Sequence, residues 1–386
     1  MHVPDGFINA PVSVAAGVAA AGAVAYSLRG ARRELGGAAG QVTGMGGERT
    51  APLAGLVAAF IFAVQMLNFP VAAGTSGHLL GGALAAILVG PYTGVLCISV
   101  VLLMQGLLFA DGGLTALGVN ILVMGVVTVL VAYGLFRGLL RVLPQRRSSV
   151  TAASFVAAVI SVPAAAVAFT GLYAAGGTAD VELAKVFTAM AGVHVLIGIG
   201  EAAITAATVG AVIAVRPDLV YGAREFASRP LQLRTAAGQE EPAAAAPAPQ
   251  AAATPRTNRR MWLGGTVAAL LCAGVVSFYA SPSPDGLEKV AADNGIDEKA
   301  QDHAAADSPL ADYGIKEIAD TRLSGGLAGV IGVGATLAAG SAVFVAVRRR
   351  QTATATGTAP ATGTAPATNG HSDHSDHSDH SDHEAV

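Results

Sequence analysis

The first two residues of the chain carry nitrogen donors at a spacing that suits a chelated metal ion. The Met1 α-amine, the deprotonated amide of His2 and the His2 Nδ1 would close fused five- and six-membered chelate rings. One further imidazole, for which we take His78, would complete a square of four nitrogens that suits Ni(II) or Cu(II). Deprotonating the amide costs free energy, which the metal has to offset. We expect Met1 to be retained, because methionine aminopeptidase requires a small second residue.

Polar residues are rare in the apolar stretches, so each one is informative. The topology described below brings most of them to the outer half of the helix bundle, which predicts a site that faces outside. Glu201 lies nearer the middle and is expected to pair with a polar neighbour. The alternative for each residue is a hydrogen bond between helices, and for His2 it is an ordinary surface histidine. The residues in question are Gln65, Asn68, His78, Gln105, Asp111, Asn120, His194 and Glu201.

Motifs that would indicate an enzyme are absent from the sequence. It contains no G-x-x-x-x-G-K-[ST] loop for ATP phosphates, no H-E-x-x-H zinc motif and no G-x-S-x-G elbow with triad partners. We therefore expect a protein that is not an enzyme and that does not itself hydrolyse ATP. Near the C-terminus, H-S-D repeats space five histidines three residues apart between 371 and 383. They would bind divalent metals loosely or form a solvated tail.

Membrane helices must position these groups. Hydrophobic residues make up 53% of the 386 residues and charged residues only 13%, against about 25% in soluble domains. So little charge cannot cover the surface of a soluble protein of this size, which predicts an integral membrane protein. Both cysteines, Cys97 and Cys272, lie in apolar stretches, which excludes a disulfide framework.

The expected fold is an all-α integral membrane protein, with a seven-helix bundle followed by a two-helix membrane hairpin. Gly90-Pro91 divides residues 79–109 into two helices that are short for a bilayer. An acidic loop, residues 281–322, joins the two helices of the hairpin. The expected helices cover residues 8–28, 52–69, 79–90, 92–109, 114–136, 151–174, 187–215, 261–280 and 323–347.

The arginines predict the orientation of these helices. With the N-terminus outside, 18 of the 19 arginines lie on the inner side and only Arg322 lies outside, as the positive-inside rule requires. Because the basic cluster follows the first apolar stretch, that stretch is expected to be a retained helix and not a cleavable signal. We expect a multi-pass protein of the cell membrane with a cytoplasmic C-terminus.

Composition divides the chain into four parts. Residues 1–220 form a metal-binding membrane domain, and residues 259–350 form the two-helix domain with its acidic outer loop. Between them, residues 221–258 are rich in Ala and Pro, which is typical of a flexible cytoplasmic linker. Residues 351–386 have the composition of a disordered His-rich tail.

Several stretches resemble one known family. The start MHVPDGF, together with NFPVAAGTSGHLLGGALAAILVGP (68–91), QGLLFADGGLTALGVNILVMG (105–125) and HVLIGIGEAAITA (194–206), is similar to CbiM/NikM proteins. These are the substrate-binding components of energy-coupling-factor (ECF) ABC transporters for cobalt and nickel. SPDGLEKVA (283–291) resembles the small CbiN/NikN partner with its PDGLE motif, here fused to the same chain. Val71-Ala72-Ala73 departs from the Gly/Pro-rich run expected before G-T-S-G-H, which makes the geometry of the His78 loop uncertain.

This resemblance implies a ligand set, a function and partners. The Met1 amine, the backbone nitrogen and imidazole of His2, and His78 would hold Ni(II) or Co(II) as transported substrate, with no prosthetic group. A transmembrane coupling (T) subunit and two ATPase (A) subunits would supply energy, and no nucleic acid is involved. The hairpin would contact the outer face of the bundle and load metal or open the N-terminal segment. Supporting groups around the ligands would be Asn68, Asp111, Asn120 and His194.

Two other functions remain open at this point. An intramembrane metalloenzyme would use His78, His194 and Glu201, although no H-E-x-x-H pairing is present. A self-contained secondary metal transporter would need proton-relay carboxylates in mid-membrane, where only Glu201 qualifies. Square-planar nitrogen donors favour nickel, but low-spin Co(II) tolerates similar geometry, so both ions remain candidates.

Overall fold

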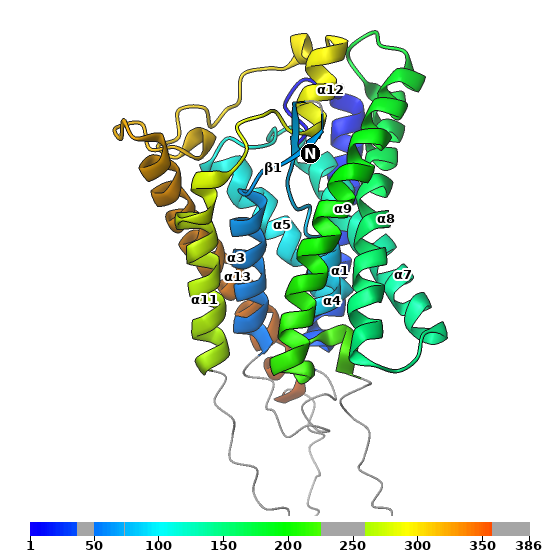
Figure 1. Ribbon diagram of the computed structural model, residues 1–386, viewed down its shortest axis with the longest axis vertical. Helices are drawn as coiled ribbons and strands as arrows, with labels where there is room; N and C mark the ends of the chain where they lie inside the picture. Colours follow the sequence, from blue (N-terminus) through cyan, green and yellow to red (C-terminus); the bar gives the residue numbers. More distant parts are fainter. Residues whose placement is uncertain (37–49, 73, 225–258, 357–386) are drawn as a thin grey trace, which may run out of the picture.

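The computed structural model describes residues 1–36, 50–72, 74–224 and 259–356 as a bundle of long helices (Figure 1). We call residues 1–224 the N-terminal unit and residues 259–356 the C-terminal unit. Most of the expected linker and His-rich tail lies outside the described residues. The long helices are α1 (Ala10–Gly36), α3 (Thr50–Gln65), α5 (Pro91–Leu108), α7 (Thr128–Val142), α8 (Arg147–Gly176), α9 (Leu183–Val215), α11 (Arg259–Gly274) and α13 (Thr321–Thr356).

Short elements connect the long helices and cover one end of the bundle. We call this end, where residue 1 and the short helix α12 lie, the α12 end (Figure 1). The strands β1 (Phe69–Ala72) and β2 (Thr75–Gly77) form a small antiparallel pair near it, which the sequence analysis did not predict. The short helices and turns are α4 (Gly82–Val89), α6 (Leu117–Asn120), the π-helix η2 (Ile121–Val127), η3 (Pro217–Leu219), η4 (Tyr221–Ala223), η5 (Val276–Tyr279), α12 (Gly286–Asn294), η6 (Asp297–Lys299) and η7 (Ala311–Tyr313).

The described residues contain seven helical stretches long and apolar enough to cross a membrane. Residues 52–65 of α3 form a further, shorter apolar stretch. The prediction of an all-α integral membrane protein is therefore confirmed. The spanning stretches are Ala10–Leu35, Pro91–Leu108, Leu117–Val142, Arg147–Gly176, Leu183–Val215, Met261–Tyr279 and Thr321–Arg348.

The apolar stretch at 79–109 is divided as predicted, and its first part is a half-helix. All eight residues of α4 are buried, and at about 1.5 Å per residue the helix is too short to cross a bilayer. Contacts with α5, α7, α8 and α9 enclose it, so protein rather than lipid surrounds its ends. At the break, Gly90 has a φ of 99° and Pro91 begins α5, an N-terminal position that suits proline.

Buried polar groups hold the start of α4 and the loop before it. The carboxylate of Glu201 accepts hydrogen bonds from Leu80 N (2.6 Å) and Gly81 N (3.3 Å). Gln65 Nε2 donates to the Leu80 carbonyl oxygen at 2.9 Å. The partners of Glu201 are thus backbone amides rather than the polar side chain that we expected. Because His78 precedes Leu80 by two residues, these bonds also fix the loop that carries it.

The two units pack against each other along their length. Helices α11 and α13 of the C-terminal unit contact α3, and α13 crosses α3 where Gly55 faces Gly340. Small residues at such a crossing let helix backbones approach closely. At the α12 end, Ser76 N donates to the Pro284 carbonyl oxygen (2.8 Å) and Ser281 N to that of Asn68 (2.7 Å). The C-terminal unit therefore closes over the β1–β2 hairpin.

Helical structure extends into the first residues of both the expected linker and the expected tail. Residues 221–223, at the start of the expected linker, form η4, which packs against α4. Helix α13 continues to Thr356, six residues into the expected tail.

Candidate metal centre

Residues 1–9, which we call the N-terminal segment, enter the bundle from the α12 end. Met1 is only 2% exposed and Val3 is fully buried. Gly113 N donates to the Val3 carbonyl oxygen at 2.9 Å, and Asn120 Oδ1 accepts from Val3 N at 2.8 Å. The Asn120 amide also donates back to the Val3 carbonyl oxygen at 3.1 Å. Asn120, where α6 passes into the π-helix η2, therefore positions the first three residues.

Asp5 and Gly6 turn the N-terminal segment back toward α1. The Asp5 carboxylate accepts hydrogen bonds from Leu114 N (3.2 Å) and Thr115 N (2.8 Å). Gly6 has a φ of 91°, and a Cβ at this position would overlap the Lys299 carbonyl oxygen of the C-terminal unit. Only glycine combines this backbone conformation with such a close approach. In the P-D-G sequence, Asp5 therefore serves as a hydrogen-bond acceptor, and Gly6 provides a positive φ and room for the Lys299 carbonyl oxygen.

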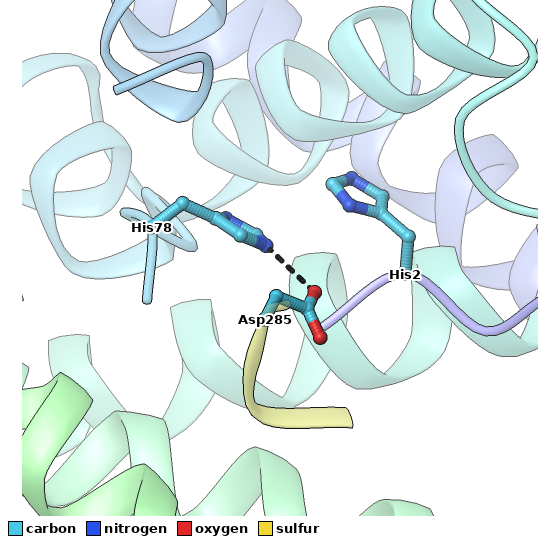
Figure 2. A group of neighbouring side chains, drawn as sticks. All are labelled: His2, His78 and Asp285. Atoms are coloured by element: carbon cyan, nitrogen blue, oxygen red, sulfur yellow. Dashed lines mark ion pairs between the residues drawn. The ribbon is translucent and has the colours of Figure 1, made fainter. Parts of the chain in front are cut away.

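The Met1 α-amine contacts both His78 and Asp285. Figure 2 shows these two side chains facing each other, with His2 beside them. The amine nitrogen is 2.5 Å from His78 Nε2 and 2.7 Å from Asp285 Oδ2. The other ring nitrogen of His78, Nδ1, lies 3.0 Å from the Leu79 carbonyl oxygen. Because a carbonyl only accepts, Nδ1 carries the hydrogen and Nε2 presents its lone pair to the amine. His78 is therefore in the tautomer that a metal ligand needs.

The His2 ring stacks on His78, with centroids 5.0 Å apart and planes 18° from parallel. Its Nδ1 lies 3.2 Å from Asp111 Oδ1, and its Nε2 lies 3.2 Å from Gln105 Oε1. Burial lowers the pKa of His2 to about 4, so the imidazole is neutral at pH 7. A neutral imidazole is the form that binds transition metals.

Asp285 comes from the C-terminal unit, where it caps the N-terminus of α12. Its Oδ1 accepts from Leu287 N (2.7 Å) and Glu288 N (2.9 Å), while Glu288 Oε2 accepts from Asp285 N (2.8 Å). This capping box leaves Oδ2 facing Met1 and, at 3.5 Å, His78 Nε2. Burial raises the pKa of Asp285, but the Met1 ammonium group and His78 lower it more, so it lies well below its ordinary value. The carboxylate is therefore ionised and rigidly held.

Together these groups form a buried cluster of donor atoms. Ligating atoms of His2, His78 and Asp285 lie within 4.8 Å of one another, and all three residues are buried. A cavity of about 590 Å³ adjoins them and is lined by residues of both units. The cluster offers nitrogen donors from the N-terminal unit and one carboxylate from the C-terminal unit, a mixed set that suits a divalent transition metal.

One of the four predicted supporting residues, Asp111, contacts the cluster directly through His2. Asn120 acts through the backbone, because it holds Val3, the residue after His2. Asn68 lines the same cavity, and its carbonyl oxygen accepts a hydrogen bond from Ser281 N. His194 lies next to Gly286 at the start of α12, and its Nδ1 lies 2.8 Å from the Met190 carbonyl oxygen.

Sequence reasoning missed two residues of this site, Asp285 and Tyr313, which both belong to the C-terminal unit. Gln105 was among the polar residues expected near an outward-facing site, but without a role of its own. Asp285-x-x-Glu288 is a recognisable capping pattern, which could have located the start of α12. Nothing local in the sequence indicates that the cap also faces Met1, because that contact spans 284 positions.

Known proteins with similar sequences are metal transport proteins. Over 221 residues (57% of this chain), the chain is 40% identical to "Putative metal transport protein HQ_3621A" of Haloquadratum walsbyi, covering 94% of that protein. It is 38% identical over 221 residues, again 57% of this chain, to "Putative fused nickel transport protein NikMN" of Archaeoglobus fulgidus, covering 68% of that protein. A solved structure, "Crystal Structure of an Truncated Transition metal Transporter", is 26% identical with a TM-score of 0.46. That match covers 55% of this chain and 99% of the solved one.

Two family models match separate parts of the chain. Residues 2–219 match CbiM, described as "Cobalt uptake substrate-specific transmembrane region". Residues 259–349 match the PDGLE domain, which contains Asp285 and α12. The first match covers more than half of the chain and includes every nitrogen donor discussed above except the Met1 amine. The chain therefore belongs to the CbiM family of cobalt and nickel transport components, with a PDGLE domain fused to it.

Proposed function

We propose that this chain captures Ni(II) or Co(II) with four nitrogens: the Met1 amine, the His2 amide, His2 Nδ1 and His78 Nε2. The observation that carries this proposal is the contact of the Met1 amine with His78 Nε2 at 2.5 Å, beside the stacked His2 ring. Met1 and His2 supply three donors in fused chelate rings, and His78 supplies the fourth. Nitrogen donors in a square suit Ni(II) best, and one relative is named as a nickel transport protein.

Metal binding requires the His2 ring to move. In this structure its Nδ1 faces Asp111 Oδ1 at 3.2 Å rather than the Met1 amine. Turning the ring about its side-chain bonds would direct Nδ1 toward the Met1 amine and the His2 amide.

The charge of the buried site supports this exchange. The Met1 ammonium group is paired with the Asp285 carboxylate. A divalent ion that enters displaces one proton from the ammonium group and one from the His2 amide, as ligand deprotonation requires. Two positive charges arrive and two protons leave, so the total charge beside Asp285 does not change. Asp285 thus neutralises both states, which avoids burying an unpaired charge.

The charge distribution supports an orientation in which the α12 end faces outward. Arginines occur at the α7–α8 junction and at the end of α9. These helix ends lie at the end of the bundle opposite α12 (Figure 1). An excess of Lys and Arg marks the cytoplasmic side of a membrane protein. The acidic loop between η5 and α13 lies at the α12 end. Metal would therefore enter from outside, between the loop of the C-terminal unit and the N-terminal segment.

Partner subunits would supply the energy for transport. The sequence has no Walker A motif, so we propose a separate transmembrane coupling subunit and two ATPase subunits. The C-terminal unit would load the metal, because Asp285 already contacts the amine that becomes a ligand. Residues 225–258 would be the cytoplasmic linker between the two units. Glu201, on which both alternative functions depend, uses its two oxygens for the Leu80 and Gly81 amides, so the geometry favours neither.

The test is nickel and cobalt binding to the purified full chain, measured by competition with a chromophoric chelator. Adding one residue before Met1 moves the amine away from His78, and His2→Ala or His78→Ala removes a donor. Loss of a residue that only hydrogen-bonds a metal ligand weakens binding by roughly 10–100-fold. Because each of these changes removes a ligand itself, we expect a larger loss of affinity.

His303→Ala is the matched control, because His303 lines the same cavity and binds the Gly112 carbonyl oxygen instead of the cluster. All variants keep the His-rich tail, so any metal that the tail binds is a common background. An extended N-terminus that still binds nickel with the original affinity would show that the amine is not a ligand.

A further inference from the structure

Tyr313 of the C-terminal unit reaches the groups that surround His2. Its hydroxyl lies 2.6 Å from Asp111 Oδ2 and 3.0 Å from Gln105 Nε2. The hydroxyl has one hydrogen, and a carboxylate can only accept, so this hydrogen goes to Asp111. The Tyr313 oxygen then accepts from the Gln105 amide nitrogen. Tyr313 thereby determines which way the Gln105 amide points.

The orientation of Gln105 in turn places a proton on His2. With its nitrogen directed at Tyr313, Gln105 presents Oε1 to His2 Nε2 at 3.2 Å. A carbonyl oxygen only accepts, so this contact favours a hydrogen on Nε2. In the neutral ring, Nδ1 is then left with a lone pair.

This tautomer is not the one that Asp111 alone would select. Asp111 Oδ1 lies 3.2 Å from His2 Nδ1, and two acceptors facing each other repel. A hydrogen on Nδ1 would instead donate to the carboxylate, which is the usual arrangement of a histidine beside an aspartate. Among the contacts of the His2 ring, the one between Nε2 and Gln105 Oε1 opposes this arrangement and favours a hydrogen on Nε2.

We propose that Tyr313 is a positioning residue that holds His2 in the Nε2–H tautomer through Gln105, and so keeps Nδ1 free to bind the metal. This inference rests on the proposed function, in which Nδ1 is the chelating nitrogen. It also gives the fused C-terminal unit a second role at the site, independent of Asp285.

The surroundings of Tyr313 are built to hold its hydroxyl in place. The ring stacks on Phe109, with centroids 4.8 Å apart and planes 20° from parallel. Asp312 N donates to the Phe109 carbonyl oxygen at 2.9 Å. Asp312 and Tyr313 both have a φ of 54°, a strained conformation for residues with a side chain that persists only where the surroundings impose it. Burial raises the pKa of Tyr313 well above its ordinary value, so the hydroxyl remains a donor.

The direct test is the tautomer of His2 in the metal-free full chain. Protein with ¹⁵N-labelled histidine in lipid bilayers is studied by NMR, and the His2 signals are identified by their absence from the His2→Ala spectrum. The ¹⁵N shifts of the two ring nitrogens distinguish the tautomers. We expect Nε2–H in the wild-type chain and a shift of population toward Nδ1–H in Tyr313→Phe.

The second measurement is nickel affinity. Tyr313→Phe keeps the stack on Phe109 but removes the hydroxyl, and we expect affinity to fall about 10-fold or more. Tyr279→Phe, which removes a hydroxyl from an 82% exposed ring of the same unit, is the control and should match the wild type in both measurements. A role in packing alone would leave the tautomer of Tyr313→Phe unchanged.

The outcomes separate this proposal from the proposed function. If wild-type His2 carries its hydrogen on Nδ1, or if Tyr313→Phe leaves the tautomer unchanged, the positioning role is wrong even where nickel binds. If neither protein binds nickel but the tautomer changes as expected, the positioning role stands and the proposed function fails. Once the His2 signals are assigned, the wild-type spectrum decides the first point without Tyr313→Phe.

Discussion

The proposed ligands at this site already have hydrogen-bond partners in the protein, and His2 is an example. Binding of a metal would break some of these contacts and keep others. Each ring nitrogen of His2 faces one protein group, Asp111 or Gln105. The Met1 amine likewise has two partners, His78 and Asp285. In the proposed exchange Asp285 is not a ligand, but its carboxylate balances charge before and after the metal binds. Its contribution can therefore be separated from that of the ligands.

At the residue scale we predict that Asp285→Asn weakens nickel binding by about 10-fold or more. Asparagine can still accept from the α12 amides through Oδ1, but it no longer balances the bound ion in a buried site. The measurement is the chelator competition used above. Asp307→Asn, in an exposed part of the same loop, should leave the affinity unchanged. Equal or tighter nickel binding by Asp285→Asn would contradict the charge balance.

At the scale of elements, the N-terminal segment carries metal ligands, and several contacts along its length fix its position. Asn120 holds it near residue 3, the Leu114 and Thr115 amides hold Asp5, and Gly6 lies against the C-terminal unit. The His78 loop is supported separately, by Glu201 and Gln65 at the start of α4. Two independently supported elements therefore meet at the Met1 amine.

We predict that Gly6→Ala weakens nickel binding although residue 6 is not a ligand. Alanine in a left-handed conformation costs roughly 1–2 kcal/mol, or about 5–30-fold in an equilibrium constant, and its Cβ would also collide with the Lys299 carbonyl oxygen. Gly22→Ala is the control, because a Cβ at Gly22 in α1 meets nothing within 4 Å. The two variants are compared by chelator competition, and equal affinities would show that the segment tolerates a different path.

At the scale of the whole molecule, the fusion brings the carboxylate and the nitrogen donors to one place. Helix α13 packs along α3, and α12 lies against α9 and the β1–β2 hairpin. The same packing puts the acidic loop and the metal cluster at one end and most arginines at the other. A single orientation in the membrane therefore decides from which side metal enters.

We predict that the α12 end is accessible from outside the cell. In intact cells, a membrane-impermeant thiol reagent should label Asp302→Cys and not Arg146→Cys, whereas after permeabilisation it should label both. The two positions are exposed and lie at opposite ends of the bundle. Wild-type chain is the background control, because Cys97 in α5 is buried and Cys272 in α11 is partly buried. Labelling of Arg146→Cys alone in intact cells would reverse the orientation.

Much of the architecture could be predicted because it depends on local patterns. Apolar length predicted the membrane helices, and Gly90-Pro91 predicted the break between α4 and α5, since a bilayer and a proline act on short stretches of chain. The β1–β2 pair was missed, since strands of three and four residues have no periodicity to detect. The chelating potential of Met1-His2 was also local, because the rings close within one dipeptide.

Only the tertiary structure decided what surrounds that chelate. His78 meets the Met1 amine because Glu201 and Gln65 hold its loop, and Asp285 and Tyr313 reach the site because α12 and η7 fold over the bundle. The contacts of His78 and Asp285 with Met1 join positions 77 and 284 residues apart, so no spacing in the sequence encodes them. Residue type by itself determined which chemistry was possible. Packing determined which ring nitrogen of His2 is protonated, that the carboxylate of Asp285 lies beside the nitrogen donors, and that the site is at the α12 end. These features depend on distances that exist only in the folded chain.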